Sequence, residues 1–264
     1  MRSEIARSVI PLDAPPAARP VSVRSKSRTS SELLWSRRTP GATTRGGLCE
    51  GQIVATALDI IDRDGIEALN MRRIASDLGV GTMSLYWHVR NKEDLLWLVV
   101  DQIVGTVDVP PATDDWRADL LALLRNFRAA LLLHRRALPL LNGRPGFGPR
   151  SLSFIDRMLG ALALAGLSQS AASRAYGICV VFAVGFTASE VVTLDQTWDG
   201  SPRAEALKRD LAAYLADLPG DEHPNLRSMS ADLIWSGGDE AFELGLRALV
   251  DGFDVLVSGS EALA

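Results

Sequence analysis

Cysteine and histidine are scarce in this chain, which has two cysteines and three histidines among 264 residues. Cys49 and Cys179 lie far apart without the close spacing of metal ligands, and two cysteines do not form the disulfide framework of a secreted domain. His88, His134 and His223 are scattered, so no two of them share a helix face. We therefore expect no metal site, no cofactor and a reducing, cytoplasmic location.

Signatures of catalysis and of phosphate binding are also missing. The glycines of residues 143–148 lack the spacing of a phosphate-binding loop and follow no predicted strand. Residues 62–65 imitate part of a calcium loop, but its first and twelfth positions would be Ile60 and Met71, which are not ligands. There is no nucleophile elbow. An enzyme built on a helical bundle is therefore kept only as an alternative interpretation.

Long apolar segments are absent as well. Four prolines between residues 11 and 20 interrupt the N-terminal stretch, which lacks the apolar core of a signal peptide. The uncharged run 175–189 has 15 residues, short of the roughly 20 that a helix needs to cross a bilayer. We expect this run to be a helix buried on all sides, in a protein with no membrane partner.

The segment 78–92 has the pattern of two short helices separated by a tight turn. Gly79 ends the first helix at a position that suits a left-handed backbone. Leu85 and Val89, four residues apart, share the inward face of the second helix. This pattern predicts a helix-turn-helix, whose second helix can enter the major groove of DNA. The outward face then carries Thr82, Met83, Ser84, Tyr86, Trp87 and His88.

Helical signals surround this motif. Apolar residues recur at helical spacing over residues 52–64, and Gly65 follows them as a stop signal. Asn70 and Asn91 stand where they can cap two further helices. Together these signals predict a three-helix DNA-binding domain over residues 47–95. In the alternative interpretation, Tyr86 and Trp87 belong to the core and Asn91-Lys92 is an ordinary loop.

The net charge of −4 is unevenly distributed. Residues 1–48 hold nine basic and three acidic side chains, whereas residues 49–104 hold five basic and nine acidic ones. The predicted DNA-binding unit must therefore use a few placed contacts and not a broad basic surface. Residues 1–46, rich in proline, serine and arginine, are predicted to be a disordered extension. Its last arginines, Arg37, Arg38 and Arg45, could lie along DNA phosphates or enter the minor groove. The alternative is a solvated tail with only nonspecific attraction to DNA.

A family resemblance is carried by the runs Gly65-Ile-Glu-Ala-Leu-Asn-Met-Arg-Arg-Ile-Ala and Leu85-Tyr-Trp-His-Val-Arg-Asn-Lys92. Residues 52–92 resemble, without gaps, the DNA-binding domain of the TetR family of repressors, in its tetracycline-repressor-like subfamily. The resemblance implies that Arg72 reads a base edge. It also implies base contacts from Thr82, Met83 and Ser84, and backbone-positioning contacts from Tyr86, Trp87, His88 and Lys92.

Beyond residue 105 the pattern is almost entirely helical. Helices are predicted over residues 114–133, 151–165, 168–196 and 239–257, with a partly looped segment over 197–225. The last two of these helices are apolar on more than one face, which predicts a four-helix interface with a second subunit. The residues expected there are Val181, Val184, Leu246, Leu249 and Phe253.

The resemblance continues more weakly here and implies that residues 96–258 form a ligand-binding and dimerisation domain. Of the positions that approximately match drug contacts, such as Asp108, only Phe127 keeps its residue type, so tetracycline with magnesium is not the expected ligand. The apolar lining predicts a hydrophobic or aromatic effector, although apolar residues on inner helix faces can also be plain core. The pocket residues would be Leu123, Phe127, Leu141, Phe154 and Phe182.

Together, these observations predict an all-α protein with an N-terminal helix-turn-helix domain and a C-terminal helical bundle. The resemblance implies a homodimeric repressor that binds a palindromic operator in double-stranded DNA. A small-molecule effector would release it by shifting the helix that begins at Lys92. The alternative is a constitutive DNA-binding regulator, an activator or architectural protein, without an effector.

Overall fold

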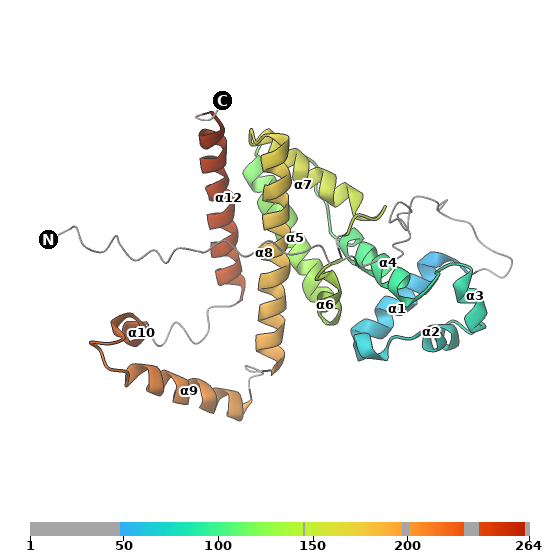
Figure 1. The fold of residues 1–264 in the computed structure, drawn as a ribbon, viewed down its shortest axis with the longest axis horizontal. Coiled ribbons are helices and arrows are strands. Elements are labelled where there is room, and N and C mark those ends of the chain that lie inside the picture. The colour runs from blue at the N-terminus through green and yellow to red at the C-terminus, as the bar shows by residue number, and fades with distance from the viewer. Residues whose placement is uncertain (1–47, 145, 197–200, 230–237, 262–264) are drawn as a thin grey trace, which may run out of the picture. The chain divides into compact units, whose positions relative to one another are not determined.

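The computed structural model describes residues 48–144, 146–196, 201–229 and 238–261. The predicted basic extension, residues 1–46, lies outside them. The secondary-structure elements of the described residues are all helices (Figure 1). The all-α prediction is therefore confirmed.

The first helices share one hydrophobic core. They are α1 (Glu50–Asp64), the short 3-10 helix η1 (Ile66–Ala68), α2 (Met71–Asp77), α3 (Thr82–Tyr86) and α4 (Lys92–Gly105). Asn70 caps α2 by accepting a hydrogen bond from Arg73 N at 3.0 Å, and Asn91 caps α4 by accepting from Asp94 N at 2.8 Å. Gly65, with a φ of 90°, ends α1. The local signals therefore act where the sequence places them.

The following helices form a bundle around a second core. They are α5 (Trp116–Leu133), η2 (Arg135–Ala137), α6 (Leu138–Leu141), α7 (Leu152–Leu164), α8 (Gln169–Gln196) and α12 (Asp239–Glu261). Asp115 caps α5 by accepting a hydrogen bond from Ala118 N at 3.0 Å. Gly166, with a φ of 88°, lies just beyond the end of α7. The core lies where the inner faces of α5, α7, α8 and α12 meet.

One helix, α4, belongs to both cores. Its apolar residues up to Ile103 pack in the first core, whereas Val104 packs in the second. The short α6 is divided in the same way, with Leu140 in the first core and Leu138 in the second. The predicted domain boundary between residues 95 and 96 therefore falls inside a continuous helix.

The helix α8 is much longer than the uncharged run 175–189 within it, so that run's short length does not rule out a membrane span. The helix has 28 residues, and Gln169–Val192 is long and apolar enough to cross a membrane, a test that core helices also pass. In this fold α8 packs against α5 and α7, and its buried Glu190 forms an ion pair with Arg128 at 2.9 Å. Within the single chain the expected burial on all sides is not met, because Val181 is 72% exposed. One side of α8 faces outward.

In the described part of the chain between α8 and α12 there are two more helices. They are α9 (Pro202–Ala216) and α10 (Pro224–Ser228). The Ser201 hydroxyl caps α9 by accepting a hydrogen bond from Ala204 N at 3.1 Å. The prediction of a partly looped segment over residues 197–225 holds only in part, because residues 202–216 form a regular helix. Its prolines mislead because Pro202 and Pro224 occupy the first turns of helices, where proline is favourable.

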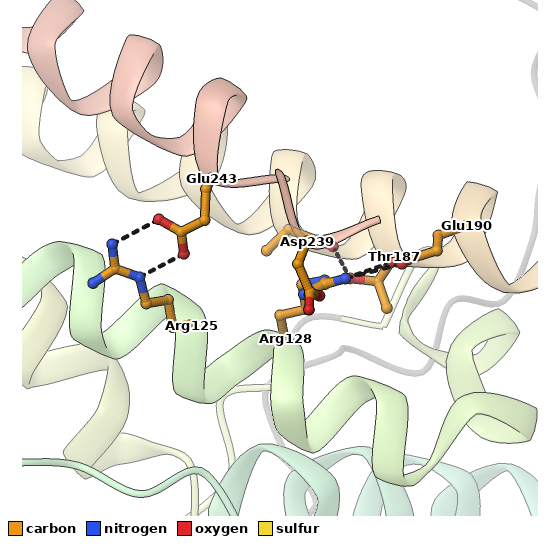
Figure 2. A network of polar contacts seen from close by, with 7 residues as sticks. Arg125, Arg128, Thr187, Glu190, Asp239 and Glu243 are labelled. Atoms are coloured by element: carbon orange, nitrogen blue, oxygen red, sulfur yellow. Dashed lines mark hydrogen bonds and ion pairs between the residues drawn. The ribbon is translucent and has the colours of Figure 1, made fainter. Parts of the chain in front are cut away.

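A nearly buried arginine joins three helices of the bundle (Figure 2). Arg128 on α5 donates through Nη2 to both carboxylate oxygens of Glu190 on α8 at 2.9 Å, and through Nη1 to Asp239 on α12 at 2.8 Å. Its guanidinium lies 4.7 Å from the ring centroid of Phe242. Because a buried charge is costly without its partner, this network selects one arrangement of the three helices.

Further ion pairs join α5 to α12. Arg125 binds Glu243 through two hydrogen bonds of 2.6 Å, and these bonds lower the pKa of the Glu243 carboxyl (Figure 2). Arg117, at the start of α5, pairs with Asp254 in the later part of α12. Since residues earlier in α5 pair with residues later in α12, the two helices run antiparallel.

The segment before α7 lies directly on α4. Asp101 of α4 is fully buried, and its carboxylate accepts a hydrogen bond from Ser151 N at 3.0 Å. A Cβ added to Gly148 would lie 2.2 Å from the Asp101 Cγ. Only glycine leaves room for this approach.

We expect Gly148→Ala to destabilise the fold by about 1–3 kcal/mol, because the added methyl overlaps a buried carboxylate. Gly160, exposed on α7, is the matched control, since nothing lies within 4 Å of its Cβ. Gly160→Ala should stabilise by about 0.5–1 kcal/mol, as glycine is unfavourable inside a helix. Urea unfolding followed by circular dichroism measures both variants, and equal stabilities would contradict the close packing at Gly148.

Burial raises the pKa of the Cys179 thiol to about 12. Because the thiolate is the reactive form, Cys179 should not react with Ellman's reagent at pH 8 in the native protein. The partly exposed Cys49 should react. The expected thiol count is one in native buffer and two in guanidinium chloride, and a Cys49→Ser variant should give none until it unfolds. Rapid native reaction of that variant would show that α8 opens readily.

Candidate nucleic-acid interface

The turn between α2 and α3 is closed by backbone hydrogen bonds. Gly79 has a φ of 65°, the left-handed conformation that the sequence predicts. Its N–H donates to Ser76 O at 3.1 Å, and Val80 N donates to Ala75 O at 2.9 Å. The side chain of Val80 packs on the first core. These contacts hold α3 against α2 in the geometry of a helix-turn-helix.

The short helix α3 has two different sides. Leu85 and the following Val89 are fully buried, as predicted from their spacing. Met83 is 75% exposed and Trp87 is 85% exposed, while Tyr86 is also exposed. The interpretation that placed the aromatic pair in the core is therefore excluded by the fold. A methionine and a tryptophan left in solvent make a surface that fits contact with another molecule.

The other residues predicted to contact DNA are accessible to different degrees. Arg72 on α2 and Ser84 on α3 are exposed, whereas Thr82 and His88 are half-buried. All of them retain solvent-accessible surface in the free protein. Their contacts with DNA stay predictions.

Lys92 has a partner that the sequence does not reveal. Its Nζ donates a hydrogen bond to Leu69 O at 2.7 Å, which ties the first residue of α4 to the segment just before α2. The predicted phosphate contact would compete with this bond or share the ammonium group with it. Lys92 therefore positions the two helices as well as carrying charge.

Acidic and basic side chains link α1 to α2. Asp64 pairs with Arg63 at 3.2 Å and with Arg73, and Arg63 also lies 3.6 Å from Asp77. The hydrogen bond from Arg63 lowers the pKa of the Asp64 carboxyl. Asp64, in the segment that imitates a calcium loop, is thus bound by two arginines. Among the described residues, no group of three or more histidine, cysteine or acidic side chains is placed to hold a metal ion.

The end of α5 is joined to α1 by polar contacts. His134 Nδ1 lies 2.7 Å from Asp62 Oδ2, and Arg136 donates to Arg63 O. At the start of α4, Glu93 pairs with Arg144 at 3.0 and 3.1 Å. Sequence reasoning missed all of these contacts because the partners are far apart in the chain.

The predicted pocket residues fall into two aromatic groups. Phe127 and Phe154 are buried with ring centroids 5.0 Å apart, and Leu123 lies in the same core. Phe182 instead packs with Phe186 and Phe242, at centroid distances of 5.8 and 5.4 Å, on the side of α8 that meets α12. Leu141, the remaining predicted pocket residue, ends α6 and packs against both hydrophobic cores.

The residues predicted for the dimer interface are also divided. Val184, Leu246 and Phe253 are buried inside this chain's own core, and their part in an interface stays a prediction. Val181 is exposed, and Leu249 is partly buried. Among the side chains of α8 and α12 whose burial is described, Ile178, Val192 and Leu244 are further large apolar ones that are exposed.

Comparison with known families identifies both parts of the chain. Residues 53–97 match the family described as bacterial regulatory proteins, tetR family. Residues 110–257, more than half of the chain, match the family described as tetracyclin repressor-like, C-terminal domain. The first match contains the helix-turn-helix, and the second contains the bundle.

Individual relatives agree with these matches. An HTH-type transcriptional regulator of Saccharopolyspora erythraea is 32% identical, covering 86% of this chain and 96% of the relative. The HTH-type transcriptional repressor DrrR1 of Streptomyces coeruleorubidus is 31% identical, covering 86% and 85%. The structure of the Streptomyces coelicolor protein ActR in complex with actinorhodin has a TM-score of 0.69 and 31% identity, covering 80% of this chain and 98% of ActR.

These relatives are transcriptional regulators and not enzymes, which removes the alternative of an enzyme on a helical bundle. Their regulatory role matches the helix-turn-helix with its exposed outer face. The chain belongs to the TetR family of DNA-binding transcriptional regulators.

Proposed function

We propose that this protein is a homodimeric repressor that reads a palindromic operator with α3 and is released by a hydrophobic or aromatic effector bound in the bundle. The observation that carries the DNA-binding part is the two-sided α3. Leu85 is fully buried, while Trp87 on the opposite side is 85% exposed. An apolar side chain held in solvent by a well-packed helix has its natural explanation in a binding surface.

The DNA contacts follow from the chemistry of the accessible side chains. Arg72 can make a bidentate contact to guanine, and Met83 can contact a thymine methyl. Thr82 and Ser84 can also reach base edges, while the phosphate backbone would be contacted by Tyr86, Trp87, His88 and Lys92. Since the unit carries a net negative charge, these few contacts have to supply the affinity and the specificity.

Replacing Arg72 with Ala should weaken binding to the operator by about 1–3 kcal/mol and relax the sequence preference at one position per half-site. Arg90, which is also exposed, is the control for a general loss of positive charge. Arg90→Ala should weaken operator and scrambled DNA alike. Fluorescence anisotropy on both DNAs measures this, and equal losses for Arg72→Ala on the two DNAs would contradict base reading.

The proposed dimer rests on the apolar side chains that the fold leaves outside. Ile178 and Val181 lie one helical turn apart on α8 and are 47% and 72% exposed, and Leu244 on α12 is 72% exposed. Because α8 and α12 pack together, these side chains belong to one helix pair (Figure 1). A second copy of the same pair would complete a four-helix interface.

Val181→Asp should convert the dimer to monomers without unfolding the chain, because the new charge would be buried only in the assembly. Leu164→Asp, at an exposed apolar position at the end of α7, is the matched control and should stay dimeric. Light scattering gives the mass of each variant, and circular dichroism checks the fold. A wild-type protein that is monomeric at micromolar concentration would contradict the proposal.

The proposed effector site is the part of the bundle core around Phe127 and Phe154. Apolar and aromatic side chains dominate this region, and ActR, a relative of similar fold, binds actinorhodin. The close contact of the two rings favours the alternative, a constitutive DNA binder with a solid core. An effector would have to part these rings or bind beside them.

Actinorhodin is a suitable probe for this site. It should raise the melting temperature and release operator DNA over the same concentration range, since both effects arise from one binding equilibrium. At about 100 times its dissociation constant, the stabilisation should be about 2.7 kcal/mol. Tetracycline with magnesium is the control and should do neither. Failure of a wider set of aromatic compounds to do either would favour the constitutive regulator.

A further inference from the structure

A fully buried carboxylate on α4 binds the start of α7. Asp101 accepts hydrogen bonds from Ser151 N at 3.0 Å, from the Ser151 hydroxyl at 2.8 Å and from Arg150 N at 3.2 Å. The guanidinium of Arg150 lies 3.9 Å away. Charge-assisted hydrogen bonds of this kind are stronger than neutral ones.

These bonds replace the usual cap of α7. Ser151 precedes the first residue of α7, yet its side chain makes no capping bond within its own helix. Its hydroxyl lies instead against Asp101, at 2.8 Å, and the carbonyl oxygens of Gly146 and Gly148, at 2.6 and 2.9 Å. The negative charge that favours a helix N-terminus thus comes from α4. A movement that separates the first turn of α7 from α4 would break these bonds.

Glycines also allow α4 and the segment before α7 to approach each other closely. A Cβ on Gly105 of α4 would lie 2.6 Å from the Arg150 Cβ, and a Cβ on Gly146 would lie 3.1 Å from Val104 Cγ2. With Gly148 against the Asp101 carboxylate, the glycines before α7 place their backbone directly on side chains of α4. Such a contact moves as a unit because packed interiors transmit displacement.

The other end of α4 reaches the DNA-reading helix. Leu95 of α4 shares the first core with Leu85 and Val89, the buried residues on either side of Trp87. In its first turn, directly after Ser151, α7 carries Phe154 into the second core, beside Phe127. The Asp101 contact therefore lies between the proposed effector site and the recognition helix.

We propose that Asp101 is the positioning residue that fixes α4, and with it α3, to the first turn of α7. This clamp, defined as Asp101 with Arg150 and Ser151, makes the orientation of the recognition helix follow α7. Its regulatory meaning rests on the proposed function. The mechanical coupling can be measured without DNA or an effector.

Hydrogen–deuterium exchange of the full-length protein tests the coupling. Asp101→Asn keeps the size of the side chain but turns an amide donor toward backbone N–H groups that need acceptors. We expect protection to fall by about tenfold or more at residues 148–155, through α4 and at residues 82–92, since buried donors lose their partner. Ser151→Ala removes only the hydroxyl and should give a smaller change in the same places.

Asp115→Ala is the control, because Asp115 caps α5 and lies outside the clamp. It should release the first turn of α5 and leave residues 82–92 protected. Loss of protection confined to residues 146–155 in the clamp variants would overturn the proposal and reduce Asp101 to a cap. If circular dichroism shows that Asp101→Asn does not fold, Ser151→Ala decides in the same way.

Binding of operator DNA is measured separately. If the coupling is present and the proposed function holds, Asp101→Asn should bind operator at least about tenfold more weakly than wild type, with unchanged binding to scrambled DNA. If wild type itself binds no specific DNA, the proposed function fails, while the exchange result still decides the coupling. Unchanged operator affinity in a variant with released α4 would overturn the claim that the clamp orients the recognition helix.

Discussion

The shared use of α4 by two hydrophobic cores is the constraint on which the rest of the structure depends. The helix packs with α1 and α3 up to Ile103, and Val104 then packs in the bundle. It has no flexible link between these parts, since α4 is continuous from Lys92 to Gly105. A change in the bundle that moves α4 would therefore also move the helices that share the first core with it.

Polar contacts reinforce this constraint at several points. His134 meets Asp62 of α1, Arg144 meets Glu93 at the start of α4, and Asp101 holds the segment before α7. Each contact joins the DNA-binding unit to the bundle. The pairs are specific in direction and partner, so they favour a small number of arrangements between the two parts.

A different balance governs the DNA-binding surface. The unit is acidic overall, and two of its arginines near α2 already form ion pairs with Asp64 and Asp77. The accessible residues of α3 are aromatic, apolar or hydroxyl-bearing. Sequence-specific contacts at base edges and a few phosphate contacts therefore fit this surface better than nonspecific attraction to DNA.

Local features of the fold follow directly from the sequence. The caps at Asn70, Asn91 and Asp115 and the turn at Gly79 depend on residues within a few positions of one another. The exposure of Trp87 also follows, because Leu85 and Val89 suffice to bury one side of a short helix. Periodicity is reliable where a helix has one apolar face.

Other features could not be read from the sequence. A helix that is apolar all round does not reveal which side meets its own core, so Val181 and Val184 looked equivalent although only Val184 is buried. Long-range polar pairs such as Asp101 with Ser151 carry no local signal. The helix α9 was obscured because proline marks both loops and helix starts.

Selection of DNA fragments from the protein's own genome tests the central claim most directly, since it asks whether two copies of α3 read one symmetric sequence. Fragments retained by the purified protein should share a two-fold symmetric site, with half-sites about one DNA turn apart, roughly 34–36 Å or slightly more. Fragments with no common sequence, or with a single unpaired half-site, would contradict the account of a dimeric, sequence-reading regulator.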